Sequence, residues 1–229
     1  MHWIRSAGQL WILRSLVLTW RLQGHHTLLT CDGERSATEK KEAIMEQSTI
    51  IKTVYDEHIR NYGEPDESFV FEDPEPASGV PGRIDIFSWN TNDPSDTVTL
   101  STIGMSDKPM KGANHRAELH FAIRKRLTKE EMGKLGQFMA NLALHPFLTN
   151  SYFDWWHTIA DPGNIPLFQR AIGVWFLPPF VPQGWARIKV ASTEIRILNV
   201  VPITKEEMEL KNIKQRLQAL EGIDIFTPR

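Results

Sequence analysis

The segment NHRAELHFAI (114–123) brings together residue types that bind metals and transfer protons, since His115, Glu118 and His120 fall within six positions. Zinc-binding helices place such residues three or four apart, so that they project from one helical face. His115 and His120 are five apart, and on a helix they would point away from each other. The spacing therefore argues against a helical zinc site.

The same segment has the alternation of a β-strand with one buried face. Glu118 and His120 then share the polar face, about 7 Å apart between Cα atoms, while His115 lies on the Leu119 side. Two ligands do not make a tight zinc site, which needs three or four. We expect no metal and no cofactor, and we expect Glu118 and His120 to face solvent.

Strand-like runs surround this segment. Residues 83–89, 97–103 and 116–123 are separated by short stretches of turn-forming residues, which predicts hairpins and an antiparallel sheet. Further strands are predicted at 152–159, 171–177, 186–191 and 194–203. The segment 64–82, with six acids and four prolines, is interpreted as a solvated loop, with an acidic docking segment as the alternative.

Helices are expected on either side of these strands. Residues 48–61 keep amphipathic spacing, and the helix should end near Gly63. The word TKEEM occurs at 128–132 and 204–208, where Thr and the Glu three residues later form a capping box. These signals predict helices over 128–145 and 204–219. The fold class is therefore α+β, a mainly antiparallel mixed sheet covered by helices, in a single domain over 45–229.

Residues 1–44 differ from the rest of the chain. Met1 to Cys31 contains no acid, and its apolar runs are broken by Arg14 and closed by Arg21, so it is too short and too charged to span a membrane. We interpret 1–44 as a leader or upstream extension, poorly packed, and expect a chain that begins at Met45 to keep its melting temperature.

Composition narrows the function classes. The net charge is −2 and basic residues form no stripe with interleaved aromatics, so we expect no nucleic-acid partner. Cys31 is the only cysteine, which excludes an internal disulfide and suits a reducing cytoplasm, where we place the protein. The sequence leaves the oligomeric state open.

Catalytic motifs are scarce, because the chain has no dinucleotide-binding glycine pattern, no phosphate-binding loop and no serine hydrolase motif. His157 lies between Asp154 and Asp161 and, with Glu118 and His120, would complete a polar centre. Trp155 and Trp156 are expected to pack on alternate sides of a strand. A hydrolase built on Glu118, His120 and His157 stays open as an alternative.

Several runs in order resemble the Suppressor of fused family: TLSTIGMSD (99–107), ELHF (118–121), WWH (155–157) and IRILNVVPITKEEME (195–209), closing on IDIF (223–226). The likeness covers roughly Gly82 to the C-terminus. It implies protein binding rather than chemistry, since eukaryotic members hold a transcription factor inactive by clasping a peptide between two domains. This chain resembles the single-domain bacterial branch, whose members are proposed as immunity proteins that neutralise toxins.

Three hypotheses follow. The first is a cytoplasmic, non-enzymatic, protein-binding immunity protein that neutralises a toxin or effector; the others are the hydrolase above and a structural adaptor. For the first, the expected partner-binding residues are Asp107, Lys108, Lys111, Glu118, His120, Trp156 and His157.

The 116–123 strand is central to this expectation, because it would accept a toxin loop or an added peptide strand. Gly104-x-Ser106-Asp107 before it is interpreted as a turn, with Ser106 and Asp107 bonded to their own backbone. Replacing Glu118 and His120 together by alanine should weaken binding by about 2 kcal/mol or more and change stability little.

Overall fold

The computed structural model describes residues 49–90, 97–180, 184–190 and 193–228, all within one compact unit, Gly33–Arg229. The expected leader (1–44), including Cys31, lies outside the described residues. Within the described ranges, no helix is long and apolar enough to cross a membrane.

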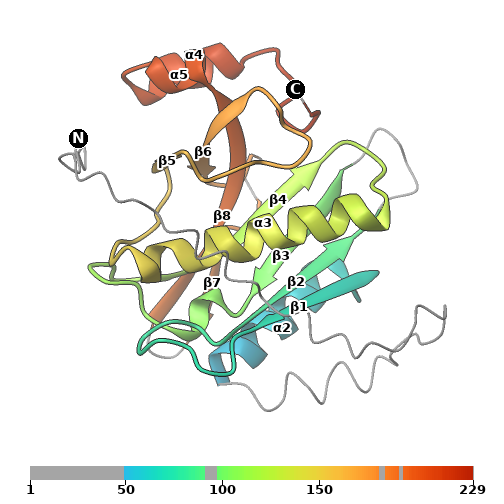
Figure 1. The fold of residues 1–229 in the computed structure, drawn as a ribbon, viewed down its shortest axis with the longest axis vertical. Coiled ribbons are helices and arrows are strands. Elements are labelled where there is room, and N and C mark those ends of the chain that lie inside the picture. Colours follow the sequence, from blue (N-terminus) through green and yellow to red (C-terminus); the bar gives the residue numbers. More distant parts are fainter. Residues whose placement is uncertain (1–48, 91–96, 181–183, 191–192, 229) are drawn as a thin grey trace. The chain divides into compact units, whose positions relative to one another are not determined.

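One eight-stranded sheet organises the unit, in the order β1-β2-β3-β4-β8-β6-β5, with β7 paired to β8 (Figure 1). Every pairing is antiparallel except β4 with β8. The strands are β1 (Glu67–Glu72), β2 (Arg83–Trp89), β3 (Val98–Ile103), β4 (Arg116–Ile123), β5 (Thr158–Ala160), β6 (Ala171–Leu177), β7 (Arg187–Val190) and β8 (Thr193–Thr204). The predicted α+β class with a mixed, mainly antiparallel sheet is confirmed.

The helices are α2 (Thr49–Tyr62), α3 (Lys129–Leu148), α4 (Lys205–Glu209) and α5 (Ile213–Leu220), with a short 3₁₀ turn η1 (Met105–Asp107) before β4. Both predicted capping boxes are present, at Thr128 with Glu131 and at Thr204 with Glu207. The side chains of each pair satisfy backbone N–H groups that the first helical turn leaves free.

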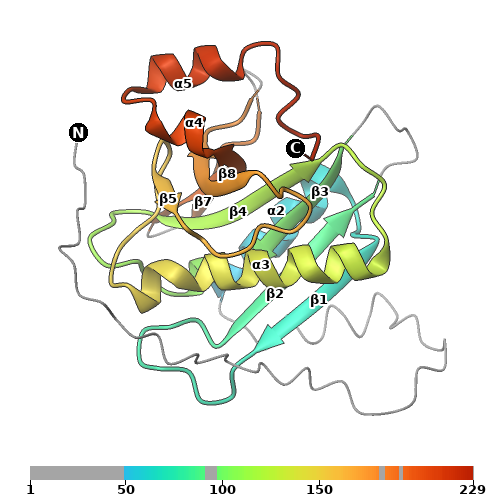
Figure 2. The same cartoon turned by 45° about the horizontal axis from the view of Figure 1, so that its top comes forward.

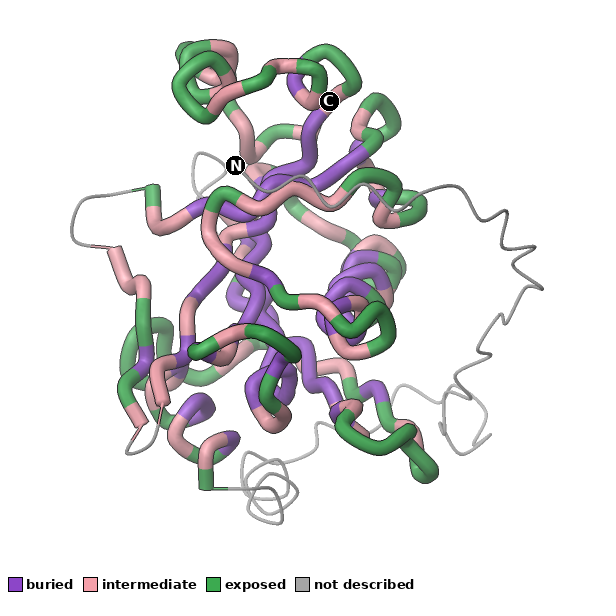
Figure 3. Tube along the Cα trace, turned by 90° about the vertical axis from the view of Figure 1, so that its left-hand side faces the viewer, coloured by how far each residue is buried: buried purple, intermediate pink, exposed green. Residues whose placement is uncertain are grey.

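The two faces of the sheet are both covered. Helix α3 lies across one face and α2 lies behind the other (Figures 1 and 2). On the α2 face, Ile51, Val54 and Tyr55 pack against a cluster from β2, β3, β7 and β8. Figure 3 shows the buried residues concentrated along the strands and one side of α3. Most residues on both faces of the central strands β2, β3 and β4 are therefore buried.

Three predicted elements were wrong in extent. The interpretation of 64–82 as a loop missed β1, whose Phe69 and Phe71 rings pack over Gly136 of α3. The prolines that suggested a loop lie outside the strand, at Pro65 and Pro74 and beyond. Apolar packing on a helix therefore outweighed the local turn signals.

The predicted strand 152–159 contains only the start of β5. The Asp154 side chain accepts the Trp155 N–H at 2.7 Å, and Trp156 has a positive φ of 71°, so the chain turns there. The expectation that Trp155 and Trp156 alternate across a strand is therefore wrong, because both lie in this turn.

The predicted helix 204–219 is divided in two. Leu210 is extended (ψ 124°), and the Asn212 side chain then accepts the Gln215 N–H to cap a new helix, α5. Helix α5 has no buried residue, whereas α4 packs on the ends of β6 and β8.

Candidate functional site

The Glu118 side chain is buried in the interior and does not face solvent. It is fully buried, at 0% exposure, on the face that α2 covers. Its carboxylate accepts hydrogen bonds from the backbone N–H groups of Gly104 and Ser106 at 3.1 and 3.0 Å, and from the hydroxyls of Ser106 and Thr102, both at 2.6 Å. The expectation that Glu118 faces solvent is therefore wrong.

Burial and hydrogen bonding act in opposite directions on this carboxylate. Removal from water penalises the charged form and raises the pKa of Glu118 from 4.5 to about 7, although the hydrogen bonds from Ser106, Thr102 and Gly104 lower it. The desolvation effect is the larger. Glu118 is therefore a buried acid that titrates close to neutral pH.

The four donors come mainly from the turn that precedes β4. Gly104 has a φ of 127°, and a Cβ there would lie 2.4 Å from the Arg83 carbonyl oxygen, so the position requires glycine. The turn itself closes through the Asp107 N–H, which donates to the Gly104 carbonyl at 3.1 Å. The Ser106 hydroxyl bonds to Glu118 and not, as the sequence had suggested, to its own backbone.

Arg116 holds the outer side of the same turn. Its guanidinium donates to the carbonyl oxygens of Ser106 and Asp107, at 2.7 and 2.6 Å. Glu118 and Arg116 are two residues apart on β4. Glu118 thus accepts hydrogen bonds from this turn, and Arg116 donates hydrogen bonds to its carbonyl groups. The sequence motifs Gly-x-Ser-Asp and Glu-Leu-x-Phe form one structural unit.

His120 is also buried, at 4% exposure, which contradicts its expected position in solvent. Its Nε2 lies 3.1 Å from Nε2 of His58 on α2, and that atom lies 2.7 Å from the Ser101 hydroxyl. Because His58 Nδ1 donates to the Val54 carbonyl at 2.7 Å, His58 Nε2 is an acceptor. Burial lowers the pKa of His58 to about 4, and burial and the charge of His58 lower that of His120.

Aromatic rings enclose this histidine pair. Trp185 lies 4.7 Å from the His58 ring and 5.5 Å from the His120 ring, and Trp89 stacks on His58 at 5.9 Å. Tyr62 closes the outer side, 5.8 Å from His120. The pair is therefore a neutral, packed part of the core.

Nor does β4 have a free edge, because it pairs with β3 on one side and with β8 on the other. The expectation that a peptide strand could add to β4 is therefore wrong. Glu118 and His120 are therefore buried on a strand that is paired along both edges.

The loop from Asp107 to Asn114 meets a second loop, Ser151–His157, at the molecular surface. A Cβ on Gly112 would lie 3.7 Å from the Tyr152 ring, and the Tyr152 ring lies 5.2 Å from that of His157. Beneath them, Met110 is buried and His115 Nε2 lies 2.9 Å from the Phe153 carbonyl oxygen. The structure thus brings Gly112, next to Lys111, and His157 against one residue, Tyr152, that was not predicted from the sequence.

The second loop is fixed to β8 through Trp155. Its ring has the guanidinium groups of Arg187 and Arg196 within 4.9 and 5.0 Å, and its Nε1–H donates to the Ile197 carbonyl at 3.0 Å. Arg196 also pairs with Asp154 at 2.5 Å. These contacts connect the loop to β7 and β8.

We call the exposed part of the two loops the loop surface: Asp107, Lys108, Lys111, Tyr152, Trp156 and His157. Lys108 and Lys111 reach solvent, and Tyr152 and Trp156 are each 37% exposed. Asp107 pairs with Lys108 at 3.2 Å. Trp156 is at the margin, because its ring packs on Trp175 at 5.7 Å and not on Tyr152.

The residues of the alternative hydrolase site have separate contacts. Glu118 binds the η1 turn, His120 binds His58, and His157 lies against Tyr152. In the part of the chain that the structure describes, no group of three or more His, Cys, Asp or Glu residues is arranged to hold a metal ion.

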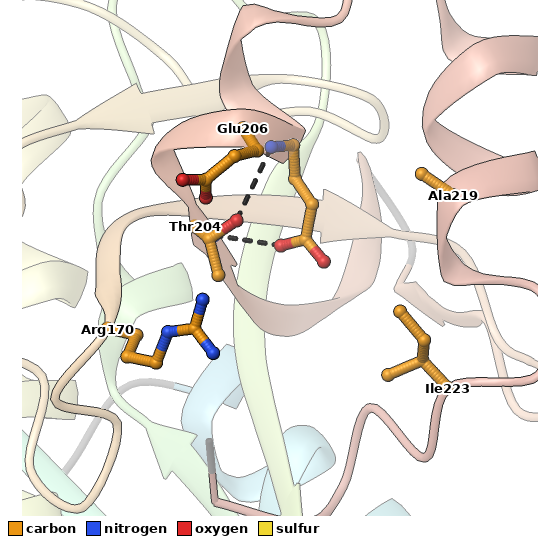
Figure 4. Close-up of a pocket in the computed structure, with 6 residues that line it drawn as sticks. Arg170, Thr204, Glu206, Ala219 and Ile223 are labelled. Carbon is orange, nitrogen blue, oxygen red and sulfur yellow. Dashed lines mark hydrogen bonds between the residues drawn. The ribbon is translucent and has the colours of Figure 1, made fainter.

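A pocket of about 430 Å³ lies elsewhere, where α4, α5 and the start of β6 meet (Figure 4). Two of its polar side chains, Thr204 and Glu207, form the α4 capping box. It contains none of the residues that the sequence predicted: its lining is Arg170, Thr204, Glu206, Glu207, Ala219 and Ile223.

Comparison with solved structures shows where this fold occurs. A Suppressor of fused homologue from Neisseria gonorrhoeae superimposes with a TM-score of 0.57 at 14% identity, over 78% of this chain and 93% of that one. A chain of the Sufu–Fu complex gives a TM-score of 0.52 at 13% identity, over 77% and 83%. Drosophila Suppressor of Fused gives 0.51 at 14% identity, over 80% of this chain and 47% of that one.

At the level of sequence, no curated protein matches this chain. The family model for Suppressor of fused protein (SUFU) matches residues 81–225, which includes the η1 turn, Glu118, both loops of the loop surface and β8. Because that match spans more than half of its residues, the chain belongs to the Suppressor of fused family.

Proposed function

We propose that this chain is a non-enzymatic protein-binding domain that neutralises a partner protein, a toxin or effector, by occupying part of its surface. Membership of the Suppressor of fused family supports binding, as does the fold that it shares with a chain of the Sufu–Fu complex, in which a related protein is joined to a protein partner. Neutralisation by binding needs no catalytic group on the inhibitor.

The observation that carries the proposal is the meeting of two loops at Tyr152. Gly112, the residue after Lys111, lies against its ring from one loop, and the His157 ring lies 5.2 Å from it on the other. Aromatic and cationic side chains that are exposed together are enriched in the central residues of protein interfaces. The loop surface has both.

The loop surface is also preformed. The Glu118 carboxylate and the Arg116 guanidinium bind one turn from two sides, and Trp155 anchors the second loop. Side chains and loops that are already ordered lose less entropy on binding. In this account Asp107, Lys108, Lys111, Tyr152, Trp156 and His157 contact the partner, and Glu118 positions the turn that carries Asp107 and Lys108.

Neutralisation is tested by co-expression. The neighbouring gene should encode a toxin, and production of this protein should restore growth to bacterial cells that express it. The Lys111→Glu, Tyr152→Ala double variant should fail to restore growth, whereas Lys214→Glu with Leu148→Ala, two exposed positions outside the loop surface, should succeed. A double loop variant that folds and protects as well as the parent would contradict the proposed surface.

A further inference from the structure

Strand β1 ends the sheet on one side (Figure 1), and among the described residues it pairs only with β2. All six of its residues are in continuous register with β2, from Glu67 opposite Ser88 to Glu72 opposite Arg83. Edge strands are usually protected from pairing with another chain by a proline, a lysine or a β-bulge. Strand β1 contains no proline, no lysine and no register shift.

The outward-facing backbone groups follow from the register. The Asp73 N–H donates to the Gly82 carbonyl at 2.8 Å, in the same register as the β1–β2 pairs. In an antiparallel pair, alternate residues direct both backbone groups to the partner strand. The N–H and C=O groups of Ser68, Val70 and Glu72 therefore point away from β2.

The strand is held firmly from one face. The rings of Phe69 and Phe71 lie over Gly136 of α3, at 3.7 Å from the position of a Cβ on that glycine. Phe71 is buried, whereas Val70 on the other face is 38% exposed. The edge is thus a preformed template with an apolar side chain at its centre.

The charge around this edge is of one sign. Between Glu64 and Gly82 there is no lysine or arginine, and the acids are Glu64, Asp66, Glu67, Glu72, Asp73 and Glu75. Arg83, the first base after them, is already paired with Glu72 at 3.0 Å and Asp85 at 2.8 Å. A basic strand is complementary to this edge.

The same charges disfavour a second copy of this chain. An antiparallel pairing of two β1 strands through these outward groups would place Val70 opposite Val70, and Glu67 of one copy opposite Asp73 of the other at both ends. Like charges directly opposite each other are destabilising. Self-pairing is therefore opposed at the two positions where a basic partner would be attracted.

We propose that the β1 edge binds an extended, basic segment of a partner protein, which adds to the sheet as a further strand. Main-chain hydrogen bonds to Ser68, Val70 and Glu72 set the register of the partner segment. The acids at both ends of β1 favour lysine or arginine at the matching positions of that segment. This site is separate from the loop surface and does not rest on its function.

Two labelled heptapeptides test this edge on the full chain: Lys-Val-Lys-Val-Thr-Val-Lys, and the same peptide with glutamate in place of each lysine. Fluorescence anisotropy should show the basic peptide binding at least about tenfold more tightly than the acidic one, and less tightly as salt rises. Glu67→Gln with Glu75→Gln should reduce the difference, and Lys111→Glu on the loop surface should leave it unchanged.

The backbone is tested separately from the charge. Val70→Pro removes an outward N–H and should abolish binding, while Val70→Thr keeps that N–H and should bind. If Val70→Pro does not fold, a basic peptide N-methylated on both edges replaces it and should not bind. Equal binding of both peptides, or binding that survives N-methylation, would overturn the proposal. A dimer that Val70→Pro dissociates would show a second copy to be the occupant instead.

Discussion

Ser106 donates both its backbone N–H and its hydroxyl to the same carboxylate oxygen of Glu118, at 3.0 and 2.6 Å. This relationship joins the turn before β4 to the middle of the sheet. The turn that carries Asp107 and Lys108 therefore depends on a fully buried carboxylate.

Removal of the Glu118 carboxylate should destabilise the fold. Glu118→Ala leaves the donors of Gly104, Ser106 and Thr102 buried without their acceptor, so we expect a loss of about 3 kcal/mol in the free energy of unfolding. Glu118→Gln keeps one oxygen for these donors and should lose about 1 kcal/mol or less at pH 6. Urea unfolding measures both; equal stability of Glu118→Ala and the parent would contradict the assignment. The sequence-based expectation that stability would change little assumed a solvent-exposed Glu118, and the structure shows that side chain to be buried.

Titration of Glu118 should make stability fall as pH rises. The pKa of Glu118 in the folded protein is about 7, above its ordinary 4.5, so its stabilisation is complete below pH 4.5 and is lost as pH rises through about 7. Between pH 5 and 8, the parent should lose up to about 3 kcal/mol relative to Glu118→Gln. If the parent instead gains stability relative to Glu118→Gln as pH rises, the four hydrogen-bond donors lower the pKa of Glu118 by more than burial raises it.

The backbone of Gly104 should be as important as the Glu118 carboxylate. A methyl group at this φ of 127° would meet the Arg83 carbonyl, so Gly104→Ala should cost about 3 kcal/mol or more. Gly133, inside α3, is the matched control, because a Cβ there would meet no atom within 4 Å. Gly133→Ala should stabilise the protein by about 0.5–1 kcal/mol. Similar effects of the two substitutions on the melting temperature would contradict this account of the turn.

The histidine pair should stay neutral in mild acid. The pKa of His58 is lowered to about 4 and that of His120 lies well below 6.5, so their contribution to stability is present above pH 6.5 and is lost as pH falls through about 4. The NMR ring-proton shifts of both residues, assigned with His58→Gln and His120→Gln, should not change between pH 8 and 5. A midpoint near pH 6.5 for either ring would show that solvent reaches it.

Local patterns predicted the elements well where local physics decides them. The alternation in β2, β3, β4, β6 and β8 and the two capping boxes at Thr128 and Thr204 were readable because they depend on neighbours in sequence. The same alternation placed Glu118 and His120 on one face, which is confirmed by their shared burial under α2.

What alternation cannot reveal is which face a helix covers. Nothing near Glu118 in sequence shows that His58 of α2, 62 positions before His120, reaches the same face. Two signals were available: the amphipathic pattern of α2 requires a surface to cover, and Ser106 and Thr102 supply donors that a buried carboxylate needs. Tyr152 was missed because its contacts with Gly112 and His157 exist only after folding.

Calorimetry most directly tests whether the loop surface contacts the partner. The product of the neighbouring gene is titrated into the parent, the Lys111→Glu, Tyr152→Ala variant, and the Lys214→Glu, Leu148→Ala control, each first shown to be folded by circular dichroism. The account predicts that the loop variant binds at least about 30-fold more weakly, equal to about 2 kcal/mol, and that the control binds like the parent. Unchanged affinity in a folded loop variant would contradict it.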